Sequence, residues 1–422
     1  MTQEFTSHPP TTMYIDINSC FATIEQQANP LLRGRPVVVA AYTSGNGCIL
    51  AASVEAKRYG IKTGMRVGDA KHVYPLLIVL SPDPEKYRYV NERLTVLLQS
   101  YSQRVQVQSI DEMIVHMDET PQLTKRIRLG QSTAERMVDI AKEIKRRIRE
   151  EIGVWITVSI GIAPNACLAK TASNLKKPDG LEIITRTNIE QVLGSLTLTD
   201  LCGIKKGNAT RLLTHGISTP LGMYQTSSDN LQRAFGSVIG RHWWLWLHGW
   251  EVGSVYREHA QMKNKSFSQS CSLTRHTSPS DRATTQVVYQ LVAKMAARFR
   301  RDGFVAQGIA AGASFTDRTF WQKHTKTTTP VYATEDIFFL AQSLLQQAPM
   351  KPIHTVFVGV YDLKAHLYAQ LTCDDAELKK IARTQAVDRI YARFGQDAIT
   401  TALTLSTPQK IIDRIAFGKS SL

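Results

Sequence analysis

The feature that most constrains this chain is a charged residue inside an apolar segment. Residues 12–17, "TMYIDI", predict a buried strand, and Asp16 stands within it. A carboxylate among buried side chains costs free energy unless a cation or a hydrogen-bond donor pairs with it. A second apolar segment, residues 105–117, breaks at "SIDE", which contains Asp111 and Glu112, and then resumes. This break predicts a hairpin with the acidic pair at its bend.

These carboxylates indicate a site for divalent metal ions. Oxygen ligands suit Mg²⁺ or Mn²⁺, and two such ions held by Asp16, Asp111 and Glu112 would serve an in-line displacement at phosphorus. One ion would activate an attacking hydroxyl, and the other would hold a triphosphate. Taken alone, each motif is better explained as an acidic turn or a strand-end charge. The two together in one basic chain favour the metal site.

The net charge indicates the kind of partner. The chain has 422 residues and a formal net charge of +15, which favours a polyanion such as nucleic acid. A basic balance also aids solubility, so charge alone leaves both explanations open. The length suggests two to four domains, and a hydrophobic content of 43% is ample for packed cores.

The cysteines and the apolar segments indicate the compartment. The six cysteines are scattered without a CxxC pair, so neither a zinc site nor a disulfide framework is expected. The first ten residues are polar and do not resemble a signal peptide. No apolar run reaches the roughly 18 residues of a membrane span. We therefore expect a reduced, cytoplasmic protein without membrane contact.

The hydrophobic pattern alternates between helices and strands along most of the chain. Helical spacing occurs in residues 20–28, 52–60, 85–103, 134–152 and 165–177. Further strands are expected at residues 35–42 and 154–163, and a helix–turn–helix pair at 195–217. Residues 271–362 contain a helix and strand-like segments, which suggests a separate α/β unit.

Six segments together resemble a known family. They are "MYIDINSCFATIEQ", "RPVVVA", "GCILAASVEAKRYGIKTGM", "QSIDE", "VSIGIAPNACLAKTASNLKKPDG" and "LCGIKKGNATRLLTHGI". They occur in the order found in the Y-family DNA polymerases, the ImpB/MucB/SamB family of translesion enzymes. The resemblance covers about residues 13–362. It implies DNA synthesis across damage, in DNA repair and the SOS response.

The resemblance implies an α/β multidomain fold shaped like a right hand. The expected parts are a ferredoxin-like catalytic palm, small fingers, a helical thumb with a helix-hairpin-helix, and an α/β little finger. They are assigned to residues 13–24 and 80–177 (palm), 25–79 (fingers), 178–250 (thumb), 251–263 (linker) and 264–362 (little finger). Residues 1–12 are expected to be a disordered lead-in, and residues 363–422 a C-terminal extension.

By motif position, the resemblance makes Asp16, Asp111 and Glu112 the catalytic metal ligands. The backbone carbonyl of Ile17 is a further ligand, and the expected cofactor is two Mg²⁺ ions, with Mn²⁺ as an alternative. Phe21 falls on the family's steric gate, where a rigid ring under the incoming sugar leaves no room for a 2′-hydroxyl. Read alone, Phe21 is equally well explained as part of the palm core.

Further residues are assigned to the nucleotide site. Cys20 lies beside the gate, and Cys48 and Leu50 would roof the nascent base pair. Lys170 in "CLAKTAS" and Lys57 in "VEAKRYG" would reach the triphosphate as point charges. Each lysine can also be an exposed helix charge.

Two positions depart from the pattern of many family members. Val54 and Lys57 stand where those members have a tyrosine and, three residues later, an arginine. An ammonium cannot make the bidentate contact of a guanidinium. Together with "GCILA", the departure favours the UmuC branch, the catalytic subunit of polymerase V, with the DinB branch second.

DNA contacts are expected in two segments. The turn "CGIKKGNA" resembles a helix-hairpin-helix, whose backbone amides cradle a phosphate, with Gly203, Lys205 and Lys206 as contacts. An ordinary loop between helices explains this turn as well. Lys265, Ser266 and Arg275 are candidate phosphate contacts at the start of the little finger, and exposed linker residues are nearly as good a reading.

The expected partners are primer–template DNA and dNTPs. A sliding clamp, a UmuD-like subunit and a recombinase filament stay open, because the clamp-peptide match in residues 368–375 lacks its aromatic end. The leading hypothesis is template-directed DNA synthesis, with nucleotidyl transfer from a dNTP to a primer 3′-hydroxyl. A catalytically silent DNA-binding protein and a nucleotidyl cyclase are the alternatives. All three carboxylates are present, which counts against the first, and the helix-hairpin-helix-like turn counts against the second.

Overall fold

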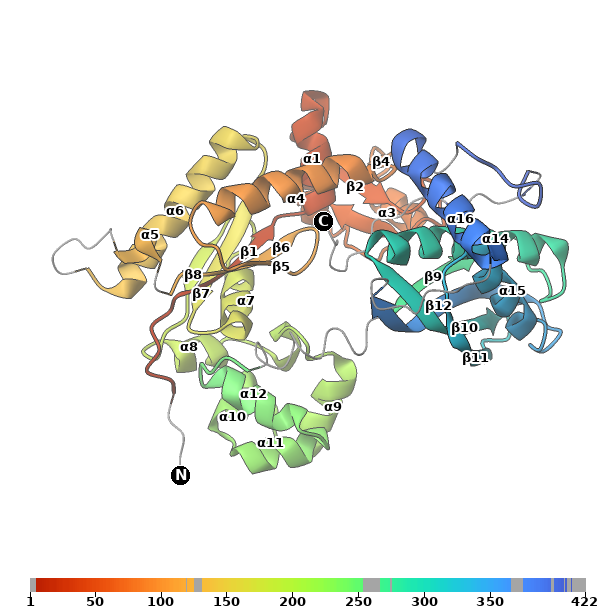
Figure 1. Ribbon diagram of the computed structural model, residues 1–422. Helices are drawn as coiled ribbons and strands as arrows, with labels where there is room; N and C mark the ends of the chain where they lie inside the picture. Colours follow the sequence, from red (N-terminus) through yellow and green to blue (C-terminus); the bar gives the residue numbers. More distant parts are fainter. Residues whose placement is uncertain are drawn as a thin grey trace. The chain divides into compact units, whose positions relative to one another are not determined.

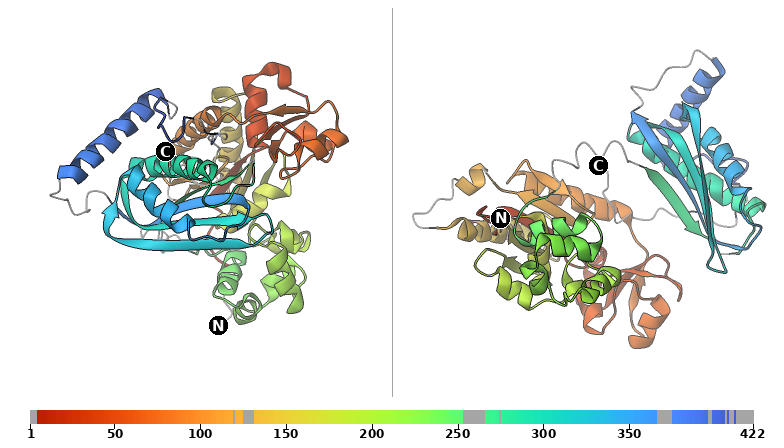
Figure 2. Two further views of the ribbon diagram at one scale, coloured as in Figure 1. Left: turned by 90° about the vertical axis from the view of Figure 1, so that its right-hand side faces the viewer. Right: turned by 90° about the horizontal axis from the view of Figure 1, so that it is seen from below.

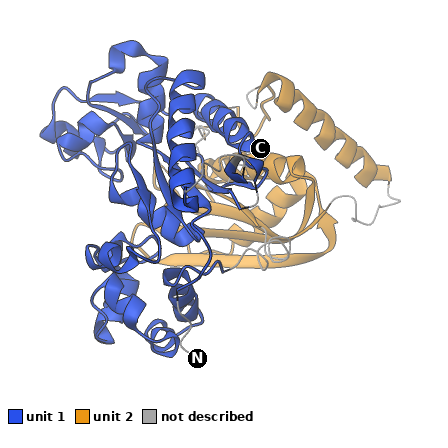
Figure 3. Ribbon diagram, turned by 90° about the vertical axis from the view of Figure 1, so that its left-hand side faces the viewer, with its two compact units in different colours: residues 1–252, 414–422 blue, residues 253–413 orange. Residues whose placement is uncertain are grey.

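The computed structural model describes the chain as two compact units. The described residues are 5–118, 120–124, 131–252, 266–273, 275–365, 375–395, 398–405, 407 and 411. The first unit lies within residues 1–252 and the second within residues 253–413 (Figure 3). No helix of the described residues is both long enough and apolar enough to cross a membrane.

The first unit is built around a five-stranded sheet with β1 (Thr12–Ile17) at its centre. The strand order is β5-β6-β1-β7-β8, with β5 at Val105–Val107, β6 at Glu112–His116, β7 at Val158–Ala163 and β8 at Leu181–Ile183. Helices α4 (Pro84–Gln99) and α6 (Thr133–Glu151) cover one face, and α7 (Ala166–Leu175) covers the other (Figure 1). Both faces are therefore closed, and every residue of β1 is buried. The predicted hairpin is confirmed, since β5 and β6 pair antiparallel with the acidic pair at the bend.

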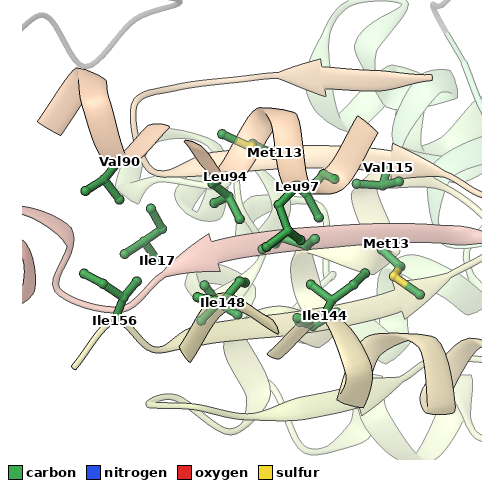
Figure 4. Packing of buried hydrophobic residues seen from close by; sticks show 14 of the residues in the cluster. Met13, Ile17, Val90, Leu94, Leu97, Met113, Val115, Ile144, Ile148 and Ile156 are labelled. Atoms are coloured by element: carbon green, nitrogen blue, oxygen red, sulfur yellow. The ribbon is translucent and has the colours of Figure 1, made fainter. Parts of the chain in front are cut away.

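The two faces of β1 belong to different hydrophobic clusters, because side chains alternate along a strand. Met13 and Ile17 point into a cluster with Leu94, Ile144 and Ile148 of the covering helices (Figure 4). Burying each such side chain contributes roughly 1.5–3 kcal/mol. The opposite face, which carries Tyr14 and Asp16, is turned toward α7. A capping box between Ser132 and Glu135 starts α6 and fixes where its apolar face begins.

A smaller three-stranded sheet lies in the segment expected to form the fingers. Its strand order is β3-β2-β4, and it packs with the helices that border it. The elements are α1 (Cys20–Ala28), the 3₁₀ turn η1 (Pro30–Leu32), β2 (Val37–Ala40), β3 (Ile49–Ala52), α2 (Val54–Arg58), α3 (Val67–Val73) and β4 (Ile78–Leu80). A single-turn helix, α5 (Pro121–Thr124), precedes α6.

Short helices follow β8 and pack beside α7. They are α8 (Ile189–Gly194), η2 (Leu198–Asp200), α9 (Lys206–Thr214), α10 (Pro220–Gln225), α11 (Ser228–Phe235) and α12 (Ile239–Leu247). Phe5 is buried in the same cluster, and the backbone amide of Thr6 donates to the carbonyl of His248 at 2.8 Å. The expectation of a disordered lead-in is therefore wrong for residues 5–12, because a partner distant in sequence orders this segment. Residues 1–4 lie outside the described residues.

The second unit is a four-stranded sheet with the order β11-β10-β12-β9. Its elements are β9 (Phe267–Ser272), α14 (Arg282–Arg301), β10 (Phe304–Phe315), β11 (Phe320–Val331), α15 (Thr334–Leu345) and β12 (Ile353–Ala365). Helices α14 and α15 lie on one face of the sheet (Figure 2). A further helix, α16 (Asp375–Phe394), is attached through Asp388, which makes a bidentate pair with the buried Arg300. Most of the expected linker, residues 253–263, and most of the candidate clamp segment, residues 368–374, lie outside the described residues.

Candidate active site

The strand register brings the predicted carboxylates together. In the antiparallel pairing of β1 and β6, Asp16 lies directly opposite Glu112. The backbone amide of Ile17 donates to the carbonyl of Asp111 at 2.9 Å, which places that residue beside the end of β1. Directly opposed residues on antiparallel strands share a face. The three acidic residues therefore lie together where β1 ends and β6 begins, and their role as metal ligands stays a prediction.

Asp16 is the most buried of the three acids, with 8% of its surface exposed. Its Oδ2 accepts a hydrogen bond from Nζ of Lys177 at 2.6 Å. Burial raises the pKa of Asp16 to about 6, although Lys177 opposes this shift. The neighbouring charges of Asp111 and Glu112 contribute to this rise in the pKa of Asp16.

Glu112 has the opposite electrostatic balance. The ammonium of Lys170 lies 2.8 Å from Oε1 and 2.9 Å from Oε2 of Glu112, and the hydroxyl of Tyr14 donates to Oε2 at 2.8 Å. Burial alone would raise the pKa of Glu112, but these donors hold it below its ordinary value. Asp111 accepts from the hydroxyl of Ser109, and burial raises the pKa of this aspartate.

These residues fit a hard divalent cation by the chemistry of their donors, which are all oxygen atoms. Among the described residues, no three acidic, histidine or cysteine side chains are grouped as a metal site. The carboxylates of Asp16 and Glu112 each face a lysine instead. The backbone positions of the predicted ligands therefore converge, while the side chains of Asp16 and Glu112 pair with ammonium groups and that of Asp111 with a hydroxyl.

A cavity of about 540 Å³ opens beside Asp16 and Asp111. Four other predicted nucleotide-site residues line it, namely Cys20, Phe21, Leu50 and Lys57. Cys48 is exposed and does not belong to the lining. Lys170 is not in the lining either, because its ammonium is held on Glu112. A triphosphate contact of Lys170 stays a prediction.

Lys177 is a charged lining residue that the sequence interpretation missed. It follows α7 in the segment "KKPDG", which reads as a helix end and a turn. In the structure its ammonium reaches Asp16 and lines the cavity together with Lys57. Burial lowers the pKa of Lys57, and the positive charge of Lys177 lowers it further. Two consecutive lysines before Pro178 were the available signal.

Phe21 packs in the core of the palm and also borders the cavity, and its role as a steric gate stays a prediction. Its ring lines the cavity and is also buried in the core, with 1% of its surface exposed. It stacks on Tyr87 of α4 with a centroid distance of 4.4 Å and an interplanar angle of 12°. The hydroxyl of Tyr87 donates to Oε1 of Glu25 at 2.9 Å. Tyr87, itself fixed by Glu25, thus supports the Phe21 ring next to the cavity.

The predicted DNA contacts are exposed where they are described. Gly203 has φ +104° at the turn before α9, a conformation that favours glycine, and Lys205 and Lys206 begin that helix. Ser266 and Arg275 are exposed in the second unit. Lys265 lies outside the described residues.

Comparisons with known proteins agree with this arrangement. Models of the impB/mucB/samB family match residues 15–174, and models of its C-terminal domain match residues 264–373. DNA polymerase IV 1 of Bacillus subtilis is 30% identical over 417 residues, covering 96% of each chain. DNA polymerase IV 1 of Halalkalibacterium halodurans is 28% identical over 392 residues, covering 92% of this chain and 91% of the relative.

Solved structures show the same fold. A Dbh–Dpo4–Dbh chimera of Y-family polymerases superposes with a TM-score of 0.68 at 22% identity, covering 84% of this chain and 99% of the chimera. An insertion ternary complex of Dbh polymerase gives a TM-score of 0.57 at 22% identity, with the same coverage. The expected polymerase fold is therefore confirmed.

Fold and site thus define a Y-family DNA polymerase. The chain belongs to the impB/mucB/samB family and is a DNA-directed DNA polymerase of the translesion type. The relatives named above are DNA polymerases IV, which represent the DinB branch. They do not support the UmuC branch that Val54 and Lys57 favoured.

Proposed function

We propose that this chain extends a DNA primer on a template by two-metal nucleotidyl transfer from dNTPs, in the manner of DinB-branch enzymes, in the cytoplasm. The observation that supports it is the meeting of Asp16, Asp111 and Glu112 at one sheet edge beside a 540 Å³ cavity. The UmuC branch remains the alternative, because of Val54 and Lys57.

Asp16, Asp111, Glu112 and the carbonyl of Ile17 would hold two Mg²⁺ ions, or Mn²⁺ in their place. Such ions, when bound, lower the pKa of an attacking hydroxyl and stabilise charge on the phosphates. Asp16 is buried, which strengthens its electrostatic interactions relative to those in bulk water.

Lys177 and Lys57 are the cations that line the cavity beside the carboxylates, together with Arg58. We assign the triphosphate of the incoming nucleotide to this side of the cavity, since ammonium groups bind phosphate as point charges. Lys170 instead orients Glu112 through its contacts with both carboxylate oxygens.

Phe21 is assigned as the steric gate, with Tyr87 as the ring behind it. Because the Tyr87 ring keeps the Phe21 ring from moving away, Phe21 would exclude a 2′-hydroxyl by steric overlap rather than by a hydrogen bond. Phe21→Ala should therefore raise ribonucleotide incorporation relative to deoxynucleotide incorporation. Unchanged sugar discrimination in a folded Phe21→Ala protein would remove this assignment.

Primer–template DNA is the proposed polymer substrate. Gly203, Lys205 and Lys206 offer a phosphate contact at the start of α9, and the exposed Ser266 and Arg275 offer others in the second unit. A sliding clamp, a UmuD-like subunit and a recombinase filament are further candidate partners, and no described contact selects among them.

Primer extension by the purified protein tests the proposal. Asp111→Ala and Glu112→Ala should abolish extension, and Glu150→Ala, an exposed acid on α6, is the matched control that should keep it. Undiminished extension by either active-site variant contradicts the mechanism. DNA binding without incorporation by the wild type would favour the silent scaffold, and template-free conversion of ATP would favour the cyclase.

A further inference from the structure

The turn that carries Lys177 lies between helix α6 and the strand ends that hold Asp16, Asp111 and Glu112. It runs from Lys176 to Gly180, between α7 and β8. On one side, Lys177 and Pro178 line the cavity beside Asp16. On the other side, Asp179 lines a second cavity of about 470 Å³, whose walls are mostly basic side chains of α6.

The cavity side of this turn is tied to the catalytic strand. The backbone amide of Asp179 donates to Oδ1 of Asn18 at 2.8 Å. The backbone amide of Gly180 donates to the hydroxyl of Ser159 at 3.3 Å, and the side-chain amide of Asn18 donates to the same hydroxyl at 2.8 Å. Asn18 comes two residues after Asp16, so these hydrogen bonds fix the position of the turn relative to the Asp16 carboxylate.

The far side of the turn is held by two cations of α6. Nζ of Lys145 donates to the carbonyl oxygens of Asp179 at 2.5 Å and Gly180 at 3.2 Å, and lies 2.9 Å from Oδ1 of Asp179. Arg149 donates to Oδ2 of Asp179 at 2.5 Å. Only 13% of the Lys145 side chain is exposed, so water screens its contacts weakly.

The backbone of the turn needs such support. Asp179 has φ +57°, a left-handed conformation that non-glycine residues adopt at a cost. A Cβ on Gly180 would lie 2.0 Å from the carbonyl oxygen of Lys176, so no other residue fits there. A turn with an unfavourable backbone conformation keeps its shape only where its surroundings determine it.

We propose that Lys145 and Arg149 are positioning residues for Lys177. They clamp Asp179 from outside the active site and thereby direct the Lys177 ammonium into the nucleotide cavity. This inference rests on the proposed function. It adds that residues of α6, on the sheet face opposite α7, set the affinity for the incoming nucleotide. In the described contacts Lys145, Arg149 and Asp179 touch none of the three catalytic acids directly, and the turn reaches Asp16 through Lys177. Loss of the clamp should therefore weaken nucleotide binding more than it slows the chemical step.

Steady-state kinetics with Arg149→Gln and Asp179→Asn test the clamp. Asparagine tolerates the left-handed conformation, so Asp179→Asn removes the charge and keeps the turn. Each variant should raise KM for the incoming dNTP about tenfold, with a smaller change in kcat, as expected when a binding group shifts. Arg146→Gln is the matched control, because Arg146 lies on the same helix and pairs only with Glu150 in the described contacts. Equal KM values for the Arg149→Gln, Arg146→Gln and wild-type proteins overturn the proposal.

A second background separates positioning from a general loss of structure. In a Lys177→Met protein, Arg149→Gln should change KM by less than about twofold, because the group it positions is gone. A tenfold effect that persists in this background shows that Arg149 does not act through Lys177. Lys145→Arg should keep most of the wild-type affinity, whereas Lys145→Met should not.

A third measurement does not depend on activity. Amine-reactive labelling followed by mass spectrometry should modify Lys177 faster in Arg149→Gln and Asp179→Asn than in the wild type. Lys176, whose side chain is 73% exposed and pairs with Glu182, serves as the internal reference. Unchanged labelling of Lys177 contradicts the clamp. A wild-type protein that extends no primer but shows the labelling difference contradicts the proposed function and keeps the clamp.

Discussion

The two lysine–carboxylate pairs of the active site carry the same charges but have different electrostatic outcomes. Lys170 binds both oxygens of Glu112, with Tyr14 as a second donor, and the pKa of this acid falls. Lys177 binds one oxygen of Asp16, which is more deeply buried, and the pKa of that acid rises to about 6. The number of donors, set against the loss of solvation, decides which acid is held ionised.

This difference suggests a division of labour between the pairs. The Lys170 pair is rigid, since three groups from β1, β6 and α7 satisfy one another. The Lys177 pair depends on a turn and lines the cavity. Under the proposed function, the first pair would hold a metal ligand in place, and the second would exchange its partner for a phosphate.

The largest expected effect is a loss of primer extension, and it should be the same for the acids of both pairs. Asp16→Asn and Glu112→Gln should each lower primer extension by about 10³-fold or more, because each removes charge stabilisation at the reacting phosphate. Single-turnover extension measures it. Retention of near wild-type rates by one of the two would show that only the other acid is a ligand.

Replacing each lysine by methionine should have a different effect in the two pairs, mainly on stability for Lys170 and mainly on nucleotide affinity for Lys177. Lys170→Met leaves the half-buried carboxylate of Glu112 with one donor and should lower the free energy of unfolding by about 1–3 kcal/mol. We expect less than the cost of breaking a fully buried pair, because 22% of each side chain is exposed. Lys177→Met should cost less stability, since this side chain is 35% exposed, and should mainly raise KM for dNTP. Urea unfolding in EDTA compares them, and the reverse order would contradict the division of labour.

Asp16 should contribute a defined part of the pH dependence of stability. Because its pKa is raised from 3.8 to about 6 on folding, its contribution is fully present below the unfolded value and is lost as pH rises through about 6. Asp16→Asn removes this loss, so the variant should gain about 1–3 kcal/mol over the wild type on going from about pH 5 to about pH 8. Denaturant unfolding without divalent ions measures it. Parallel pH profiles would show that Asp16 is not perturbed.

The smallest effect is expected at the second donor of Glu112. Tyr14→Phe removes the hydrogen bond that this hydroxyl donates to Glu112 and the one that it accepts from Lys170, but it leaves the Lys170–Glu112 ion pair in place. It should cost about 0.5–1.5 kcal/mol, with extension reduced only modestly. The same unfolding assay measures it against Lys170→Met. A cost as large as that of Lys170→Met would assign the rigidity of the pair to the tyrosine instead.

Local pattern was sufficient for the parts of the site that lie on regular elements. An apolar run located β1, and the break at "SIDE" located the hairpin that brings Asp111 and Glu112 to Asp16. The same reasoning failed for Lys177 and Phe5. Lys177 follows a helix end, and Phe5 lies in a polar lead-in, so neither has a periodic pattern around it. Their positions depend on Asp16 and on the α7–α12 cluster, which are distant in sequence.

Because Asp16 and Glu112 lie directly opposite each other, the active site also depends on the register between β1 and β6. Side chains on a strand alternate with a period of two, so a slip of one residue between β1 and β6 would reverse a whole face. Glu112 would then point toward the apolar helices α4 and α6, and Met113 toward Lys170. A single residue inserted within β6, after Glu112, would therefore move Glu112 by one position relative to Asp16 and should abolish primer extension, while most of the secondary structure stays intact.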